Sequence, residues 1–209
     1  MRLSFFTVNS DYCERLRKHD PRVPYTFDAK KNRPFVGIVY SIGCHSYYAP
    51  LTSPKPKHQA MKNQVDFLKI AGGAYGAINF NNMIPILPDQ CEKIDITSMV
   101  IRCEADEQYK NLLENQLSWC NSNIDNILSK ARKLYELVTT RRAPAQLLSR
   151  CCDFKLLEKV CNQADEEHLL ELDHPRKESI FKRLEAVQEK SQRDNAERVK
   201  KTKYIGFDR

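Results

Sequence analysis

The chain has 209 residues, of which 41% are hydrophobic and 29% charged, so it can form one substantial core but is too short for two full-sized domains. Its longest apolar run spans only a few residues and its first residues do not follow the pattern of a signal peptide, so we expect a cytoplasmic protein without a membrane helix. The whole formal net charge of +7 lies in residues 1–69, which favours a polyanionic partner such as nucleic acid, although a solvated charged face would give the same composition.

The first half of the chain has the pattern of β-strands. Apolar residues alternate or cluster in five segments, so we expect strands at Leu3–Val8, Phe35–Ile42, His45–Leu51, Ala77–Leu87 and Ile96–Cys103. Asp20–Pro34 is rich in Pro, Lys and Asp and is expected to be a loop, and loops of this length are more often functional than not. Residues 71–76 (AGGAYG) lack the Lys and hydroxyl of a nucleotide-binding loop and predict a flexible turn.

The second half changes to helical spacing. Apolar residues three or four apart predict an amphipathic helix over Asp106–Thr140, with a possible interruption at residues 121–123. A shorter helix is expected at Phe154–Cys161 with Asp153 as its N-cap. Residues 165–209 carry 11 basic and 11 acidic side chains, which indicates a charged helical extension. The predicted organisation is therefore an α+β domain over residues 1–164 and a C-terminal extension over 165–209.

Eight cysteines are spread irregularly along the chain. They contain no C-x-x-C pair and have no nearby histidine at zinc spacing, so we expect reduced core thiols and no metal site. Cys151 and Cys152 are adjacent, and a ligand or redox role for them is the less favoured alternative.

The most informative stretch is GCHSYYAPLTSPKPKH, residues 43–58. Pro50 and Pro54 fix their own φ angles and favour extended geometry in the residues before them, which stiffens the strand end that displays the hydroxyls. Within seven residues the stretch then gathers two hydroxyls and up to three cations, which are Thr52, Ser53, Lys55, Lys57 and His58. Such a set fits a phosphate in its pentavalent transition state. A turn closed by a Ser or Thr side chain, with solvated lysines, is the structural alternative.

The order of these features resembles the ToxN/AbiQ family, the protein toxins of bacterial type III toxin-antitoxin systems, whose members share a YxAPLTSPK-like segment after an F-[IV]-G-I strand. The matching stretches are SFFTVNSDYCERL with Tyr12, RPFVGIVYSI from Arg33, HSYYAPLTSPKPKH from His45, NFNNMIPILP from Asn79 and CDFKLLEK from Cys152. They occur in the family's order and at similar spacing over residues 1–164. The combination of five segments is far more specific than any one of them.

The resemblance implies a metal-independent endoribonuclease that needs no cofactor. Its fold would be a compact twisted antiparallel sheet or barrel, similar to the MazF and Kid toxins, with packed helices. The family's partner is a repeated RNA antitoxin, folded as a pseudoknot, that inhibits the toxin and is processed by it. Protein and RNA typically alternate in a closed ring, often three of each. Such toxins cleave cellular and phage RNA and act in abortive infection and antiviral defence.

Carried over to this sequence, the family's catalytic site falls on Thr52, Ser53, Lys55 and Arg33. Further residues expected to contact RNA are Tyr12, Lys31, His45, Tyr47, Lys57 and His58. Tyr47 and Tyr48 alternate along a predicted strand, so at most one of them can face a ligand. Relatives often carry lysine near the position of Arg33, and a guanidinium cannot readily act as an acid or base.

The chemistry can be derived independently of the family. RNA carries its own nucleophile, the 2′-OH, so an endoribonuclease must align that oxygen with the phosphorus, move protons and stabilise charge. Our hypothesis is that Lys55 and Arg33 bind the scissile phosphate, that Thr52 and Ser53 position it or the 2′-OH, and that His58 is a secondary candidate for proton transfer. The products would end in 2′,3′-cyclic phosphate. The alternatives are a non-catalytic protein that binds structured RNA in the same groove, and a regulatory helix-binding module that uses the charged tail.

Overall fold

The computed structural model describes residues 2–28 and 32–164 of the chain. The chain separates into two units, Met1–Asn162 and Gln163–Arg209, and the fold described below is that of the first. The predicted helical extension over residues 165–209 lies outside the described residues. Among the residues that are described, no helix has the length and apolar character needed to cross a lipid bilayer.

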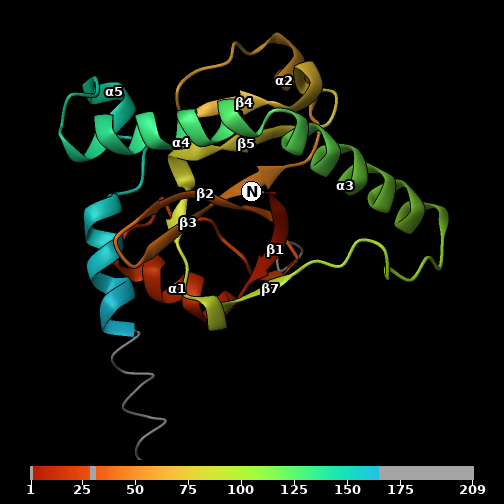
Figure 1. The fold of residues 1–209 in the computed structure, drawn as a ribbon, viewed down its shortest axis with the longest axis horizontal. Helices are drawn as coiled ribbons and strands as arrows, with labels where there is room; N and C mark the ends of the chain where they lie inside the picture. The colour runs from red at the N-terminus through yellow and green to blue at the C-terminus, as the bar shows by residue number, and fades with distance from the viewer. Residues whose placement is uncertain (1, 29–31, 165–209) are drawn as a thin grey trace, which may run out of the picture. The chain divides into compact units, whose positions relative to one another are not determined.

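An antiparallel sheet forms the centre of the unit (Figure 1). Its strands are β1 (Ser4–Val8), β2 (Phe35–Ile42), β3 (His45–Thr52), β4 (Phe67–Lys69), β5 (Ala77–Asn79), β6 (Ile84–Pro85) and β7 (Cys91–Lys93). They follow the order β4-β5-β3-β2-β1-β7, with β6 paired to β3 beside this path. The predicted α+β class with a central antiparallel sheet is confirmed.

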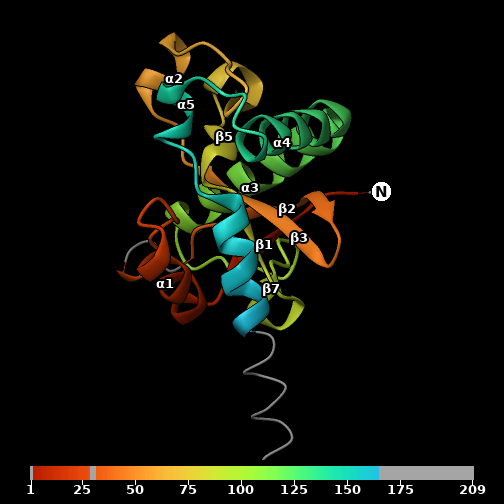
Figure 2. The same cartoon turned by 90° about the vertical axis from the view of Figure 1, so that its left-hand side faces the viewer.

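Helices surround the sheet. They are α1 (Ser10–His19), α2 (Pro56–Ala60), α3 (Glu104–Ser122), α4 (Ile124–Thr139) and α5 (Ala145–Leu148), and short 3-10 turns lie at η2 (Ile70–Gly73), η3 (Phe80–Asn82) and η4 (Pro88–Gln90). Residues 154–162 are also helical. In Figures 1 and 2, α3 and α4 follow one another above the β2–β3 hairpin, and α1 lies below it.

The β2–β3 hairpin forms where the alternating pattern predicted it. Gly43 occupies the tight turn with a φ of +56°, a conformation that L side chains rarely adopt. The two strands pair from Ile42 opposite His45 back to Phe35 opposite Pro50. Since β3 pairs with β2 on one side and with β5 on the other, it lies in the interior of the sheet, and its side chains from Tyr47 to Leu51 are buried.

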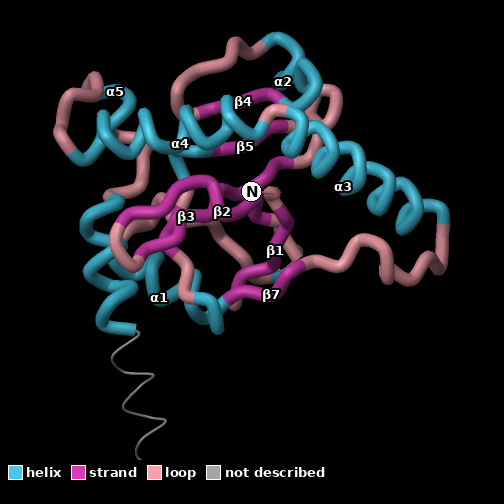
Figure 3. Tube along the Cα trace, in the orientation of Figure 1, coloured by secondary structure: helices cyan, strands magenta, loops and turns pink. Residues whose placement is uncertain are grey.

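The prediction of a strand at Ile96–Cys103 is wrong. These residues form the long loop between β7 and α3, drawn in pink in Figure 3, and the strand of this region is β7, which pairs with β1. The physical reason is Asp95, whose Oδ1 accepts hydrogen bonds from the backbone N of Thr97 at 3.0 Å and of Ser98 at 3.4 Å and so turns the chain. Val100 and Ile101 are then left 70% and 49% exposed.

The helical half follows the prediction more closely. The single apolar pattern over Asp106–Thr140 is divided into α3 and α4 at Asn123, within the expected interruption. The predicted cap is also confirmed, because the Asp153 carboxylate accepts a hydrogen bond from the backbone N of Leu156 at 3.1 Å. Helix α1 was not predicted, although Asn9 caps it by accepting from the backbone N of Asp11 and of Tyr12.

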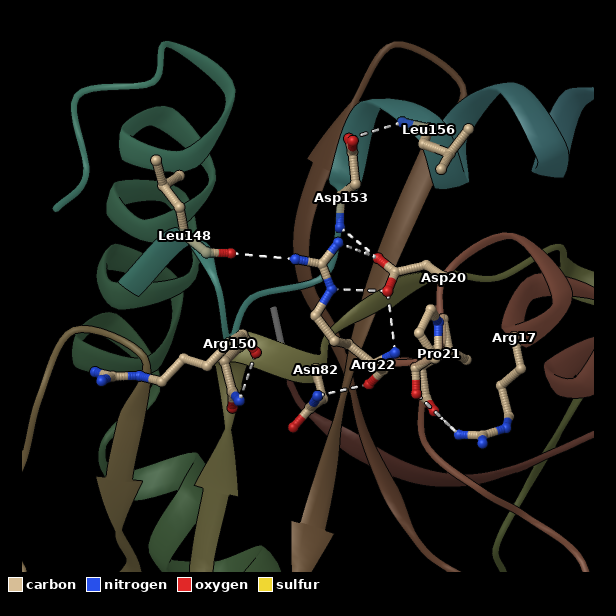
Figure 4. Close-up of polar contacts among 11 residues, drawn as sticks. Arg17, Asp20, Pro21, Arg22, Asn82, Leu148, Arg150, Asp153 and Leu156 are labelled. Atoms are coloured by element: carbon tan, nitrogen blue, oxygen red, sulfur yellow. Dashed lines mark hydrogen bonds and ion pairs between the residues drawn. The ribbon is translucent and has the colours of Figure 1, made fainter. Parts of the chain in front are cut away.

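A buried carboxylate ties the long loop to the helices (Figure 4). The Asp20 side chain is inaccessible and accepts hydrogen bonds from Arg22 Nε at 2.8 Å and from the backbone N of Asp153 at 2.7 Å. Arg22 in turn donates to the carbonyl of Leu148 at 3.1 Å. The start of the Asp20–Pro34 segment is therefore pinned to the rest of the unit, although its sequence predicts only a loop.

Candidate active site

The candidate site lies where three strand ends meet. The pairing of Phe35 with Pro50 continues as a hydrogen bond from the backbone N of Leu51 to the carbonyl of Pro34 at 2.9 Å. Continued by one more residue, this register brings Arg33 opposite Thr52. Thr52 also pairs with Ala77 at the start of β5. Residues from distant parts of the sequence thus surround the last residue of β3.

A cavity of about 480 Å³ opens at this point. Its lining combines the predicted catalytic residues with residues of α3, and consists of Asn32, Arg33, Pro34, Leu51, Thr52, Ser53, Lys55, Tyr109, Leu112 and Gln116. The structure therefore brings together all four residues to which the sequence assigned catalysis.

The two hydroxyls of the cavity differ in their freedom. Thr52 is half-buried and its Oγ1 donates to the Ala77 carbonyl at 3.3 Å, so the oxygen presents only its acceptor side to the cavity. Ser53 follows the strand end and is exposed. One hydroxyl is thus a fixed acceptor, and the other can still rotate to donate or accept.

The two cations of the cavity are available to an anion. Within residues 2–28 and 32–164, neither Arg33 nor Lys55 forms an ion pair with a carboxylate. Arg33 is half-buried, and this desolvation lowers the pKa of its guanidinium, which nevertheless stays charged at neutral pH. Lys55 is exposed and lies in extended backbone immediately before α2. The cavity therefore offers uncompensated positive charge beside two hydroxyls.

The glycine-rich turn of residues 71–76 packs closely against Thr52 and His58, at the two ends of the segment that carries Ser53 and Lys55. Gly76 has a φ of +88°, and a Cβ there would overlap the carbonyl of Thr52. Gly73 has a φ of +103°, and a Cβ there would come within 3.0 Å of the His58 backbone. The AGGAYG stretch therefore lets two chain segments approach closely at the site, which its interpretation as a flexible turn did not foresee.

The residues expected to contact RNA are not brought together in the cavity. Lys57 is exposed on α2, two residues after Lys55. His45 is partly exposed at the hairpin and lies 2.8 Å from Asn162 Oδ1 through its Nε2. Lys31 lies outside the described residues.

Both tyrosines of this set are buried. The Tyr12 hydroxyl donates to the Pro85 carbonyl at 2.9 Å, and burial raises the pKa of this phenol. The Tyr47 hydroxyl donates to Glu158 Oε1 at 2.9 Å. Tyr48, its neighbour on β3, is buried as well, so neither face of this part of the strand is open to a ligand.

His58 is buried beneath the cavity segment with 3% of its surface exposed. Its ring packs 5.8 Å from that of Phe67, and its Nδ1 has no hydrogen-bond partner among the described residues. Burial, together with the charges of Lys57 and Lys55, lowers the pKa of the imidazole. His58 is therefore neutral at neutral pH and does not line the cavity.

A second cavity, of about 600 Å³, is larger but chemically unsuited to a phosphate. It lies over the N-terminus of α1, and its described lining contains the carboxylates of Asp11, Asp89 and Glu92 and no Lys, Arg or His. Carboxylates repel an anion, so the smaller cavity with Arg33 and Lys55 is the better candidate.

The sequence missed the α3 side of the cavity. Tyr109, Leu112 and Gln116 are spaced i, i+3 and i+7, so they share one face of the helix. That spacing is visible in the sequence, but nothing in it indicated which element the face would meet.

The side chains that could bind a metal are dispersed in the described part of the chain. No group of three or more His, Cys, Asp or Glu side chains gathers at metal-binding distance in the part of the chain that the structure describes. None of the eight cysteines, all of which the structure describes, forms a disulfide bond, and Cys151 and Cys152 are buried. Burial raises the pKa of the Cys151 thiol to about 12, so it is protonated and unreactive at neutral pH.

Comparison with known proteins gives consistent results. The family model of the toxin ToxN of type III toxin-antitoxin systems matches residues 4–162. The endoribonuclease ToxN of Bacillus thuringiensis subsp. kurstaki is 34% identical over 166 residues, which cover 78% of this chain and 84% of that protein.

Two solved structures are similar over most of their length. One comes from a bacterial type III toxin-antitoxin system in which a non-coding RNA pseudoknot selectively inhibits the toxin; it has a TM-score of 0.67 and 32% identity, and covers 79% of this chain and 99% of that one. The other is AbiQ, a lactococcal anti-phage endoribonuclease of a type III system, with a TM-score of 0.66, 25% identity and the same two coverages.

Proposed function

Because the chain belongs to the ToxN family of type III toxin-antitoxin toxins, we propose that it cleaves RNA in the cavity that holds Arg33, Thr52, Ser53 and Lys55. It is an endoribonuclease toxin, and antiviral defence by abortive infection is the role that goes with the family. The observation that carries the assignment of the site is the meeting of two unpaired cations and two hydroxyls in one cavity at the end of β3.

The reaction begins with the 2′-OH of the substrate. This oxygen loses its proton to solvent water and forms a bond to the adjacent phosphorus, the bond from phosphorus to the 5′-oxygen breaks, and the product ends in a 2′,3′-cyclic phosphate. The Thr52 oxygen is suited to accept a hydrogen bond from the 2′-OH, because its own proton is committed to the Ala77 carbonyl. Thr52 would thereby orient the nucleophile.

The second requirement is to stabilise the negative charge on the phosphate oxygens. Arg33 and Lys55 would bind the nonbridging oxygens and stabilise the pentavalent transition state, with Ser53 as a further hydrogen-bond donor. Of the two cations only Lys55 can release a proton, so it is the candidate that protonates the leaving 5′-oxygen. His58 lies outside the cavity lining and would act through the position of the Lys55–Lys57 segment.

These roles require no metal ion. The cavity holds two cations and no carboxylate in its described lining, so its charge suits the phosphate directly and offers a divalent cation no anionic ligand. We therefore expect cleavage to be independent of divalent metal.

The inhibitor of such a toxin is an RNA. The related toxin of known structure is inhibited by a non-coding RNA pseudoknot, and the excess of basic residues in the N-terminal third of this chain suits a comparable partner. We expect the antitoxin to be made of pseudoknot repeats that the toxin processes, and protein and RNA to alternate in a closed ring, often three of each. Contacts to this RNA from Lys57, His45 and Lys31, and action on RNA in the cytoplasm, belong to the same proposal.

The test combines product analysis with a matched pair of variants. The purified protein is incubated with RNA, with and without a chelator, and the product ends are identified. We expect 2′,3′-cyclic phosphate ends in both conditions, loss of cleavage in Ser53→Ala, and unchanged cleavage in Ser122→Ala, which removes an exposed hydroxyl at the far end of α3. Cleavage that the chelator abolishes and that leaves 3′-hydroxyl ends would contradict the mechanism.

A further inference from the structure

The α3 side of the cavity differs chemically from the strand side. Tyr109, Leu112 and Gln116 line it from one face of the helix and become progressively more buried: Tyr109 is 36% exposed, Leu112 is half-buried, and Gln116 is 2% exposed. The three side chains thus form a wall that begins at an aromatic ring near the surface and ends at a buried amide. We call them the α3 wall.

The orientation of the Gln116 amide is fixed by its surroundings. Its Nε2 donates a hydrogen bond of 2.6 Å to the carbonyl of Tyr75, and a carbonyl cannot pair with the amide oxygen. Among the described residues, Oε1 has no hydrogen-bond partner and is not sealed from solvent. Gln116 lines the cavity, so its Oε1 is an acceptor at the cavity wall that no described residue uses.

The remaining parts of the wall are apolar or aromatic. Burial raises the pKa of the Tyr109 phenol, so the ring is neutral, and no charged side chain of α3 lines the cavity. A flat ring, an aliphatic side chain and one fixed acceptor do not match a phosphate. They match a nucleobase, which stacks on aromatic side chains and hydrogen-bonds through its edge.

We propose that the α3 wall is the subsite for a nucleobase next to the scissile phosphate, and that Gln116 Oε1 accepts a hydrogen bond from its exocyclic amino group. Adenine and cytosine carry this amino group where guanine and uracil carry a carbonyl oxygen, which an acceptor repels. The α3 wall therefore selects adenine and cytosine over guanine and uracil, and Gln116 is a specificity-determining residue. This inference rests on the proposed site of cleavage.

The test is a double-mutant cycle between the enzyme and the substrate. Single-turnover cleavage is measured for RNA oligonucleotides in which the nucleotide on either side of the scissile phosphate carries adenine, or purine without the amino group. With the wild type we expect loss of the amino group on one side to slow cleavage about tenfold, the usual scale for one hydrogen bond. In Gln116→Met the same change should have no effect.

The outcomes separate this inference from the proposed function. If Ser53→Ala and the wild type cleave the adenine substrate equally, the proposed site is wrong. Suppose instead that Ser53→Ala is inactive, but that removing the amino group slows the wild type and Gln116→Met by the same factor at both nucleotides that flank the scissile phosphate. The proposed site of cleavage is then supported, and the proposed base subsite is wrong. A purely structural role of Gln116 would lower cleavage of all substrates by the same factor.

Tyr109 gives a second test that does not disturb the buried amide. Tyr109→Leu removes a partly exposed ring, so the fold should persist. We expect it to weaken cleavage of a substrate with a base by about tenfold, and to leave cleavage unchanged when the flanking nucleotide is abasic. An equal loss with both substrates would overturn the stacking role.

Discussion

The cations of the candidate site and those that join the outer elements of the unit differ in their partners. Within the described residues, Arg33 and Lys55 have no carboxylate partner. Elsewhere three cations pair with carboxylates whose side chains are at most 10% exposed: Arg22 with Asp20 at 2.8 Å, Arg150 with Asp66 at 2.6 Å, and Lys155 with Glu158 at 2.9 Å. The contrast distinguishes cations that hold the fold from cations that can hold a ligand.

The carboxylates of these pairs connect distant segments of the chain. Arg150 follows α5 and reaches Asp66, 84 residues earlier, just before β4. Glu158 receives hydrogen bonds from Tyr47 of β3 and Tyr135 of α4. Unpaired cations make no such connection, and their mutual repulsion opposes folding. Their position in one cavity therefore indicates a role in binding an anion.

The largest effect on stability should come from Asp20→Ala. The carboxylate is inaccessible, and its removal leaves Arg22 and the backbone N of Asp153 without their acceptor. We expect the free energy of unfolding to fall by about 3 kcal/mol, measured by urea denaturation. Cleavage by the fraction that remains folded should be normal, and a specific loss of cleavage without a loss of stability would contradict the structural role.

The matching change in the site is Arg33→Gln. Removing the unpaired guanidinium should lower kcat/KM about 100-fold, because a charge that stabilises the transition state is lost. The midpoint of unfolding should stay the same or rise slightly, since no ion pair is broken among the described residues. Arg150→Gln is the control, which should lower stability and leave kcat/KM unchanged. A loss of stability without a loss of kcat/KM in Arg33→Gln would contradict its role in the site, and a loss of kcat/KM without a loss of stability in Arg150→Gln would contradict the structural role of that pair.

Gly76→Ala tests the support beneath the site. The new Cβ would overlap the Thr52 carbonyl at a φ of +88°, so we expect a loss of about 2 kcal/mol of stability together with slower cleavage. Gly43→Ala is the matched control, since its φ is also positive but nothing lies within 4 Å of the added atom. It should cost about 1 kcal/mol and leave cleavage unchanged. Equal effects of the two changes on cleavage would show that close packing on Thr52 does not matter.

The smallest expected effect is the pH dependence caused by His58. Burial and the nearby Lys57 and Lys55 lower the pKa of the folded imidazole, so the unfolded chain binds a proton more readily. This contribution to stability is complete above the unfolded pKa of about 6.5 and is lost as the pH falls toward the folded pKa. The unfolding free energy of the wild type should therefore decrease between about pH 7 and pH 5, and that of His58→Gln should decrease less. Identical dependence of the unfolding free energy on pH in the wild type and His58→Gln would contradict this role of His58.

The sequence was most informative where function and local pattern coincide. The β2–β3 hairpin follows from alternation and from Gly43, and the motif after it places Thr52, Ser53 and Lys55 correctly at a strand end. Arg33, 19 residues earlier than Thr52, was assigned to the site only through the family resemblance. The start of β2 pairs with the end of β3, and this pairing brings both residues to the same cavity.

Long-range packing explains what the sequence could not show. Tyrosines such as Tyr12 and Tyr47 are typical of RNA-binding surfaces. The hydroxyls of these two, however, donate hydrogen bonds to buried partners on segments far away in the chain. Gln116 lines the cavity because one face of α3 lies against the end of β3. Ile96–Cys103 has the apolar content of a strand, but Asp95 turns the chain before it can pair.

The proposed site implies one geometry of the bound substrate, which a crystal structure of the complex tests directly. The wild-type protein would be crystallised with an RNA in which a single 2′-deoxynucleotide at the cleaved position removes the nucleophile and prevents reaction. The scissile phosphate should lie within hydrogen-bond distance of Arg33, Ser53 and Lys55, in the cavity at the end of β3. A scissile phosphate bound anywhere else, with this cavity left open, would contradict the assignment of the site.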